Sequence, residues 1–195
     1  MRLKFSTKLV LVNILVAAVV AALIGFIVIQ GLMLILINNT VTNLTTVANE
    51  STVLIRQSIY SLATTDPAET VYIQNADFYA TQIASVYSSN IVLFDNSMHA
   101  VGSNMNLEDF SMYTDYVSQV SESREQSYVY TQTDGVNSIL FLSPVFITSK
   151  SQPVGVMLII YPTSNMDLII RYTTYLFIGG GFVSAAVVFA TRKII

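Results

Sequence analysis

The sequence predicts an α+β fold: a five-stranded antiparallel sheet with a long N-terminal helix, flanked by two transmembrane helices. Two stretches, residues 9–37 and 172–191, contain no charged side chain, and about 20 apolar residues are enough for a helix to cross a bilayer. The segment between them contains five short apolar stretches separated by turn signals, which is the pattern of strands. Strands joined by short turns form antiparallel sheets, and the helical segments among them cover one or both faces.

The first uncharged run predicts an uncleaved signal anchor. Arg2, Lys4 and Lys8 precede it, as in a secretory signal. A cleaved signal, however, has an apolar region of only about 7–15 residues and ends at a small-residue cleavage site. Residues 9–37 continue well beyond that length, and no A-x-A pattern closes them. We therefore expect a tail over residues 1–8 and a first transmembrane helix over residues 9–37.

The distribution of charge predicts the topology. All twelve acidic residues lie within residues 38–170, together with three basic ones, so this segment has a net charge near −9, whereas the two short tails are basic. Excess Lys and Arg mark the cytoplasmic side of a membrane protein. We therefore expect an extracytoplasmic domain over residues 38–170, a second transmembrane helix over 171–191 and the start of a cytoplasmic output region over 192–195. Both termini are then cytoplasmic, in a multi-pass protein in contact with membrane lipid.

Composition excludes several classes of function. The chain has no cysteine, which excludes disulfides and Cys-based zinc or redox sites. The acidic outer segment argues against binding of nucleic acid. His99 is the only histidine and belongs to no nucleophile motif, so we expect neither a catalytic residue nor a cofactor. An acidic concentration matches no calcium loop, so no metal is expected at its members, Glu108, Asp109, Asp115, Glu122 and Glu125.

Residues 38–63 are expected to continue the first span as a polar helix. Apolar and small side chains recur there at alternating three- and four-residue steps, the spacing of a coiled-coil seam. The seam consists of Val41, Leu44, Ala48, Ser51, Ile55, Ser58 and Leu62. One interpretation is a parallel homodimer, aided by small-residue pairs in the spans such as Ala21/Gly25. The alternative is an amphipathic helix that packs on its own domain through Leu54, Ile55, Ile59 and Leu62.

The remaining elements follow from turn signals and hydrophobic period. Asp66 is a good N-cap and Pro67 a good first residue for the next helix, and Asp134-Gly135 is a strong hairpin turn. The expected elements are a helix over 67–88, a strand over 91–94, a returning strand over 98–102, a helix over 108–121, and strands over 127–133, 136–147 and 154–161. The last strand, VGVMLIIY, is the most apolar, so we expect it at the centre of the sheet.

This order of elements resembles the extracytoplasmic PAS-like sensor domains of the Cache type, found in bacterial histidine kinases and chemoreceptors. The resemblance lies in the helix leaving the first span, the hairpin IVLFDNSMHAVGS and the closing segment ILFLSPVFITSKSQPVGVMLII. Asn96-Ser97 stands where many members have an Asp-Gly turn. The resemblance implies the sheet order 2-1-5-4-3, a last strand leading into the second span, and a place in the bacterial plasma membrane.

A candidate ligand site centres on Arg124. A planar guanidinium can donate two parallel hydrogen bonds to a carboxylate, and tyrosines add apolar walls with hydroxyl groups. We therefore expect a small anionic molecule or peptide to bind near Arg124, Tyr128 and Tyr130, with Phe141 and Ser143 beside them. The alternative is a salt bridge from Arg124 to a neighbouring glutamate, with ordinary strand tyrosines.

The expected function is the signal-input region of a membrane receptor, a two-component sensor histidine kinase whose output domain is not in this chain. Its two transmembrane helices are expected to pass an extracellular cue to that output. A chemoreceptor input module remains an alternative, as does a two-span membrane scaffold or partner-binding protein without a ligand.

Overall fold

The chain forms two compact units. The computed structural model describes residues 5–62, 67–87, 89–105, 110–133, 135–148 and 152–191. One unit comprises residues 1–38 and 165–195, and the other comprises residues 39–164. Helix α1 (Phe5–Leu62) contributes to both units, and α5 (Ser164–Thr191) belongs almost entirely to the first.

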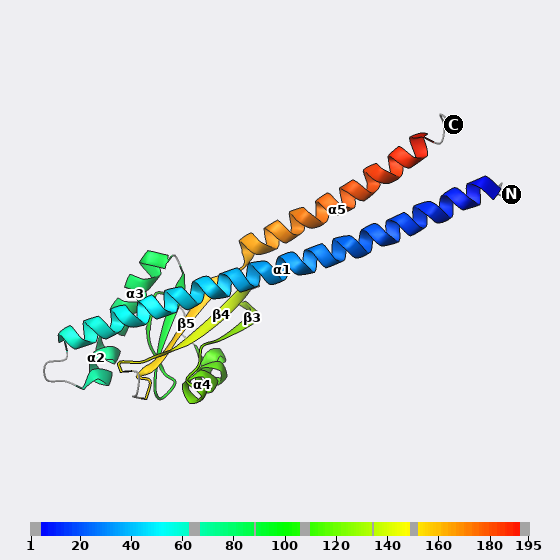
Figure 1. The fold of residues 1–195 in the computed structure, drawn as a ribbon. Coiled ribbons are helices and arrows are strands. Elements are labelled where there is room, and N and C mark those ends of the chain that lie inside the picture. The colour runs from blue at the N-terminus through cyan, green and yellow to red at the C-terminus, as the bar shows by residue number, and fades with distance from the viewer. Residues whose placement is uncertain are drawn as a thin grey trace. The chain divides into compact units, whose positions relative to one another are not determined.

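The helical unit is made of the apolar parts of α1 and α5. Within it the two helices run side by side (Figure 1), and a Cβ added at Gly25 would lie 3.3 Å from the ring of Phe177. Among the described residues, α1 is the one helix that is both long and apolar enough to cross a membrane. Its large apolar side chains in this unit, such as Phe26 and Leu34, are exposed in the single chain. The second expected span lies in α5 and stays a prediction.

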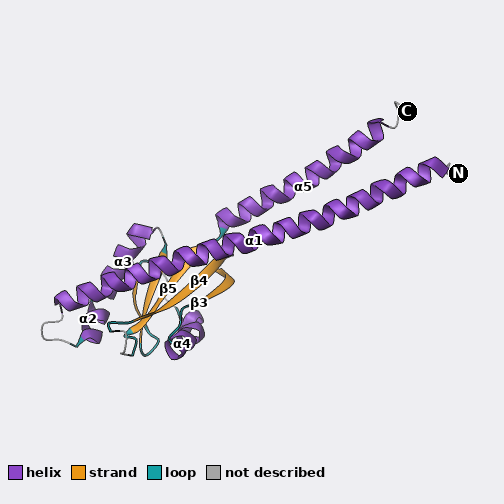
Figure 2. Cartoon of the chain, in the orientation of Figure 1, coloured by secondary structure: helices purple, strands orange, loops and turns teal. Residues whose placement is uncertain are grey.

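The outer unit is built on an antiparallel five-stranded sheet in the order β2-β1-β5-β4-β3. Figure 2 shows the strands in orange. This confirms the expected α+β class with an antiparallel five-stranded sheet, and the expected sheet order with β5 at the centre; the two flanking transmembrane helices stay a prediction. The strands are β1 (Asn90–Asp95), β2 (Ala100–Ser103), β3 (Ser127–Thr133), β4 (Val136–Val145) and β5 (Gly155–Pro162).

Helices cover both faces of the sheet. The outer half of α1, with α2 (Ala68–Gln74) and α3 (Ala76–Tyr87), lies on one face, and α4 (Thr114–Ser123) lies on the other, after the short turn η1 (Ser111–Tyr113) (Figure 1). On the α4 face a buried cluster joins the helix to the three central strands; it includes Val92, Phe94, Val117, Val120, Leu140, Leu142, Val156 and Leu158. Alternate residues of the same strands, such as Leu93, Phe141 and Met157, are buried on the α1 face.

Several boundaries differ from expectation. The helix expected over 67–88 is broken at Asn75, whose backbone N–H and side-chain amide both donate to the Val71 carbonyl. Pro67 is the N-cap of α2 rather than its first residue. The returning strand begins at Ala100 instead of Met98, because the Asp95 carboxylate accepts hydrogen bonds from the backbone of Ser97 and His99 and so extends the turn. Asx turns of this kind compete with strand pairing.

One helix begins later than expected, and one strand ends earlier. The helix expected over 108–121 has its first α-helical residue at Thr114, after η1, and residues 106–109 lie outside the described part of the chain. Strand β4 ends at Val145 rather than residue 147.

The central strand β5 is separated from α5 by one residue, Thr163, whose backbone N–H and hydroxyl both donate to the Asn137 carbonyl of β4.

Gly155 provides a test of this packing. A Cβ there would lie 2.0 Å from the Phe94 carbonyl oxygen and 2.8 Å from the ring of Tyr72, which is itself fully buried. We expect Gly155→Ala to lower the free energy of unfolding by about 2–3 kcal/mol, the usual cost of forcing extra volume into a packed core.

The control is Gly135→Ala. Gly135 lies in open space but at φ +77°, so alanine should cost about 1 kcal/mol from backbone strain alone. Denaturant unfolding of the full chain in detergent, followed by tyrosine fluorescence, measures both variants. Equal costs at the two positions would contradict the close approach at Gly155.

Candidate ligand-binding pocket

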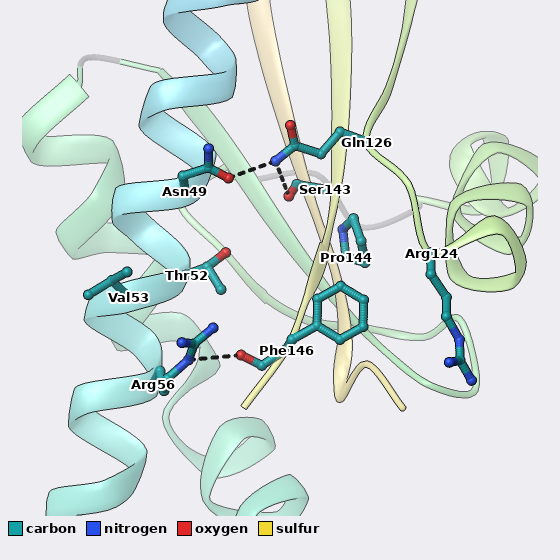
Figure 3. Close-up of a pocket in the computed structure, with 9 residues that line it drawn as sticks. All are labelled: Asn49, Thr52, Val53, Arg56, Arg124, Gln126, Ser143, Pro144 and Phe146. Carbon is teal, nitrogen blue, oxygen red and sulfur yellow. Dashed lines mark hydrogen bonds between the residues drawn. The ribbon is translucent and has the colours of Figure 1, made fainter. Parts of the chain in front are cut away.

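A pocket of about 370 Å³ lies in the outer unit, between α1 and the end of β4. Its lining residues are Asn49, Thr52, Val53, Arg56, Arg124, Gln126, Ser143, Pro144 and Phe146 (Figure 3). This volume is in the range of small-molecule sites. The lining combines two guanidinium groups with amide and hydroxyl groups and contains no carboxylate.

Helix α1 forms one wall of the pocket. Asn49, Thr52, Val53 and Arg56 are spaced three, one and three residues apart, which places them on one side of a helix. Asn49 and Arg56 are two turns apart, or about 10 Å along the axis. They therefore bound the pocket at its two ends, with Thr52 and Val53 between them.

The opposite wall exists because β3 is shorter than β4. The pairing of these strands begins at Ser127 with Leu142, so Ser143, Pro144 and Val145 have no β3 partner. Pro144 is paired to β5 on its other side and has no backbone N–H, so it presents no donor toward the open edge. The end of β4 is thus left as a free edge that faces the pocket.

Gln126 closes one end of the pocket. Its side-chain nitrogen donates to Asn49 Oδ1 at 3.0 Å and to Ser143 Oγ at 3.1 Å. This amide therefore joins α1, β4 and the residues that lead into β3 (Figure 3).

Arg56 closes the other end. Its Nε donates to the Phe146 carbonyl oxygen at 3.2 Å. One turn further along α1, the Tyr60 hydroxyl donates to the Ile147 carbonyl at 3.3 Å. Helix α1 thus holds two consecutive carbonyls in the connection between β4 and β5.

Arg124 enters from the end of α4 in an unusual backbone conformation. It is the C-cap of that helix, with φ 58° and ψ 21°, and its backbone N–H donates to the Val120 carbonyl. Glycine is the usual residue in such left-handed caps, and other residues cost about 1–2 kcal/mol there. Within the described residues, Arg124 makes no ion pair with Glu122 or Glu125. The salt-bridge alternative for this arginine is therefore not what the structure shows.

The pocket is lined by basic side chains of an otherwise acidic segment. Residues 38–170 contain three basic side chains, Arg56, Arg124 and Lys150. Lys150 lies outside the described residues, and the other two both line this pocket. An outer segment with a net charge near −9 thus places its two described cations at one hollow. Two guanidinium groups at one hollow favour negative over positive charge there.

The structure brings together only part of the predicted ligand site. Arg124 and Ser143 share the pocket. Tyr128 and Tyr130, at 45% and 39% exposure, lie on β3 opposite Phe141 and Ile139, outside the described lining. Phe141 is buried at 1% exposure, so its ring is core.

Other pocket residues were missed from the sequence. They are Asn49, Thr52, Val53, Arg56, Gln126, Pro144 and Phe146. The available signal was the helical spacing of Asn49, Thr52, Val53 and Arg56, together with the scarcity of basic residues in the outer segment. Nothing in the sequence pairs that helix face with residues 124–126 and 143–146.

The predicted seam residues are mostly buried inside the domain. Leu44, Ala48 and Ile55 are between 0% and 3% exposed in the single chain. Val41 is half-buried and Leu62 is 52% exposed. The outer part of α1 therefore packs on its own sheet through Leu44, Ala48 and Ile55, as the alternative interpretation expects of this helix. The homodimer stays a prediction.

The remaining polar candidates are His99 and the acidic concentration. His99 is exposed, with Nδ1 3.8 Å from the Asp95 carboxylate. Glu108 and Asp109 of the acidic concentration lie outside the described residues. Among the residues that the structure describes, no three acidic, His or Cys side chains are grouped so as to hold a metal ion.

Comparison with known proteins finds similarity to solved structures alone. No family model matches the chain, and no curated protein matches it. Among solved structures, the ligand-binding domain of the Campylobacter jejuni chemoreceptor Tlp3, in complex with L-valine, is 10% identical; the match covers 71% of this chain and 66% of that one, with a TM-score of 0.42. The sensor domain of the V. cholerae histidine kinase DctB is 14% identical over 70% of this chain and 60% of that one, with a TM-score of 0.41.

The chain thus spans less than two thirds of either structure. The solved structures similar to this chain include sensor domains of chemoreceptors and histidine kinases, the class that the sequence motifs resemble.

The backbone of Arg124 yields a prediction about stability. We expect Arg124→Gly to raise the free energy of unfolding by about 0.5–1 kcal/mol, because glycine removes the strain of the left-handed cap. Arg124→Ala keeps that strain and should give no such gain. Denaturant midpoints of the full chain in detergent provide the measurement.

Met98→Gly is the comparison, because Met98 is the other described non-glycine residue at positive φ, 64°. It relieves the same backbone strain but loses the packing of the methionine side chain on the core cluster, so it should gain less stability than Arg124→Gly, or lose some, and it leaves the pocket untouched. A loss of stability in Arg124→Gly alone would mean that the arginine side chain holds the fold.

Proposed function

We propose that this chain is the signal-input region of a membrane receptor that detects a small anionic molecule outside the cell. The observation that carries the proposal is the pocket itself: both described cations of an acidic domain line it, and one of its walls is a helix that also contains the uncharged run 9–37. A bound ligand at this place contacts the helix that is expected to cross the membrane.

The polar groups of the pocket suit a carboxylate or a similar planar anion. Each guanidinium offers donors in a fixed fork, and Gln126, Asn49 and Ser143 provide further hydrogen-bonding groups. Val53, Pro144 and Phe146 supply apolar surface around them. This combination of a few polar groups with apolar walls is common in small-molecule sites.

The output that we propose is a histidine kinase domain beyond the second span, with a chemoreceptor signalling domain as the alternative. The coding sequence after Ile195 discriminates them. A helix bearing a phosphorylatable histidine supports the kinase, and a coiled-coil rod of methylation sites supports the chemoreceptor. A two-span scaffold without a ligand predicts neither, and it also predicts a pocket that binds no anion.

Binding is tested by thermal unfolding of the full chain in detergent with acetate, malonate, succinate or inorganic phosphate, against chloride at equal ionic strength. A ligand present at 100 times its Kd stabilises the folded state by about 2.7 kcal/mol, so a binding anion should raise Tm by several degrees. Arg124→Met should lose most of that rise, because it removes a charged donor while keeping apolar bulk.

Gln57→Met is the control, since Gln57 is exposed beside Arg56 on α1 and lies outside the pocket lining. It should keep the full response. The proposal is wrong if none of the four anions raises Tm, or if Arg124→Met responds as the unaltered chain does.

Topology follows from the same proposal. With residues 38–170 outside the cell, an external protease should digest the domain in intact cells and leave the tagged N-terminal tail protected. The basis is the charge asymmetry, since the basic tails favour the cytoplasmic side. Immunoblots of an N-terminal tag before and after membrane permeabilisation measure it; an undigested domain in intact cells would refute the topology.

A further inference from the structure

Helix α1 is tied to the connection between β4 and β5 by two side chains one turn apart. Arg56 Nε donates to the Phe146 carbonyl at 3.2 Å, and the Tyr60 hydroxyl donates to the Ile147 carbonyl at 3.3 Å. Both acceptors are neutral backbone oxygens that directly follow the last residues of β4. These two bonds fix this part of α1 to one particular segment of the domain.

The tie made by Arg56 uses little of the hydrogen-bonding capacity of its side chain. A guanidinium has five N–H donors, and among the described residues Arg56 uses one of them, on an uncharged acceptor. The existing bond already has one ionised partner, whereas a bond from Arg56 to an anion has two and adds the Coulombic attraction between opposite charges. An anion in the pocket therefore competes well with the Phe146 carbonyl for this guanidinium.

The pocket also contains a second cation with no such tie. Arg124 enters from the C-cap of α4 and makes no ion pair within the described residues. Figure 3 shows the Arg124 guanidinium on the far side of the Phe146 ring from Arg56, so an anion that contacts both has to draw the two groups together, and it gains an attraction to each. Binding is therefore favoured in an arrangement where both guanidinium groups turn toward the ligand.

We propose that Arg56 exchanges its partner when the pocket fills: it leaves the Phe146 carbonyl and binds the anion, which ties α1 to Arg124 instead. This exchange rests on the proposed anion binding. It moves one attachment of α1 from the β4–β5 connection to the junction of α4 and β3. Because a ligand shifts only an equilibrium between states that it binds differently, this exchange gives the anion the differential contact that signalling through α1 requires.

The exchange can be followed by a distance between spin labels on α1 and on the β4–β5 connection. The chain has no cysteine, so Gln57→Cys with Gln152→Cys gives a single labelled pair at two exposed positions. Pulsed dipolar spectroscopy of the full chain in lipid nanodiscs would compare acetate, malonate, succinate and inorganic phosphate with chloride. An anion that raises Tm should shift this distance distribution.

Two variants separate the steps of the exchange. Arg56→Met removes the tie, so it should show the shifted distribution without any anion and bind the anion at least about tenfold more weakly, as expected for a lost charge-assisted bond. Arg124→Met keeps the tie and should show the original distribution with no response. If Arg56→Met does not fold, Arg56→Lys serves, because it keeps the charge but loses the planar fork.

The outcomes distinguish this exchange from binding alone. An anion that raises Tm through Arg124 without moving the labels overturns the exchange and leaves the proposed function standing. The same conclusion follows if Arg56→Met binds that anion as tightly as the unaltered chain. Failure of all four anions to raise Tm overturns both.

Discussion

The packing of α1 on the sheet is the interaction on which the pocket depends. The helix presents Leu44, Ala48, Ser51, Ile55 and Ile59 to the domain, all between 0% and 3% exposed. Two of these side chains are small, which lets the helix approach the strands closely. Residues just beside this buried stripe, including Asn49 and Arg56, are then held at its border, where they can reach the end of β4.

The central strand explains why both helix layers can form. Strand β5 pairs with β1 on one side and β4 on the other, and its residues from Gly155 to Ile160 are buried. One face receives α4 through a cluster that is apolar apart from the hydroxyl of Tyr113. The other face receives α1 with polar contacts at its border: Tyr87 donates to Glu50, Tyr79 to Ser58 and Gln126 to Asn49. The bond to Glu50 and partial burial both raise the pKa of Tyr87, with the hydrogen bond the larger cause.

The sequence was sufficient for the parts of the fold that depend on local pattern. The uninterrupted apolar run of VGVMLIIY identified the central strand, and Asp134-Gly135 located the hairpin between β3 and β4. The break at Asn75 was not predicted, because it depends on a hydrogen bond from that side chain to its own preceding turn. The extended turn at Asp95 was missed for the same reason, since such bonds compete with regular structure without altering the hydrophobic period.

The pocket was only half predictable because it depends on which segments meet. Arg124 was found because a lone arginine near tyrosines is conspicuous. Arg56 was counted as a base of the outer segment but not placed, since the pocket residues that other elements contribute are 68 to 90 positions away in the chain. The left-handed backbone of Arg124 likewise has no sequence signal, because this conformation normally selects glycine.

The contrast between the two faces of the sheet bears on how a signal could leave the domain. The α4 face is closed by apolar side chains packed at 0–3% exposure, and such cores resist small rearrangements because any void or overlap is costly. The stripe of α1 that packs on the sheet is buried to the same extent, but beside it, at the pocket, the helix is also tied by a few hydrogen bonds between polar groups that are partly exposed. Such a bond contributes about 0.5–1.5 kcal/mol net between neutral groups and about 1.5–3 kcal/mol where one partner is charged, as for Arg56, and a single charged ligand can offset one of them. A change in ligand occupancy is therefore expected to alter the attachment of α1 while the sheet and α4 stay together as a fixed base.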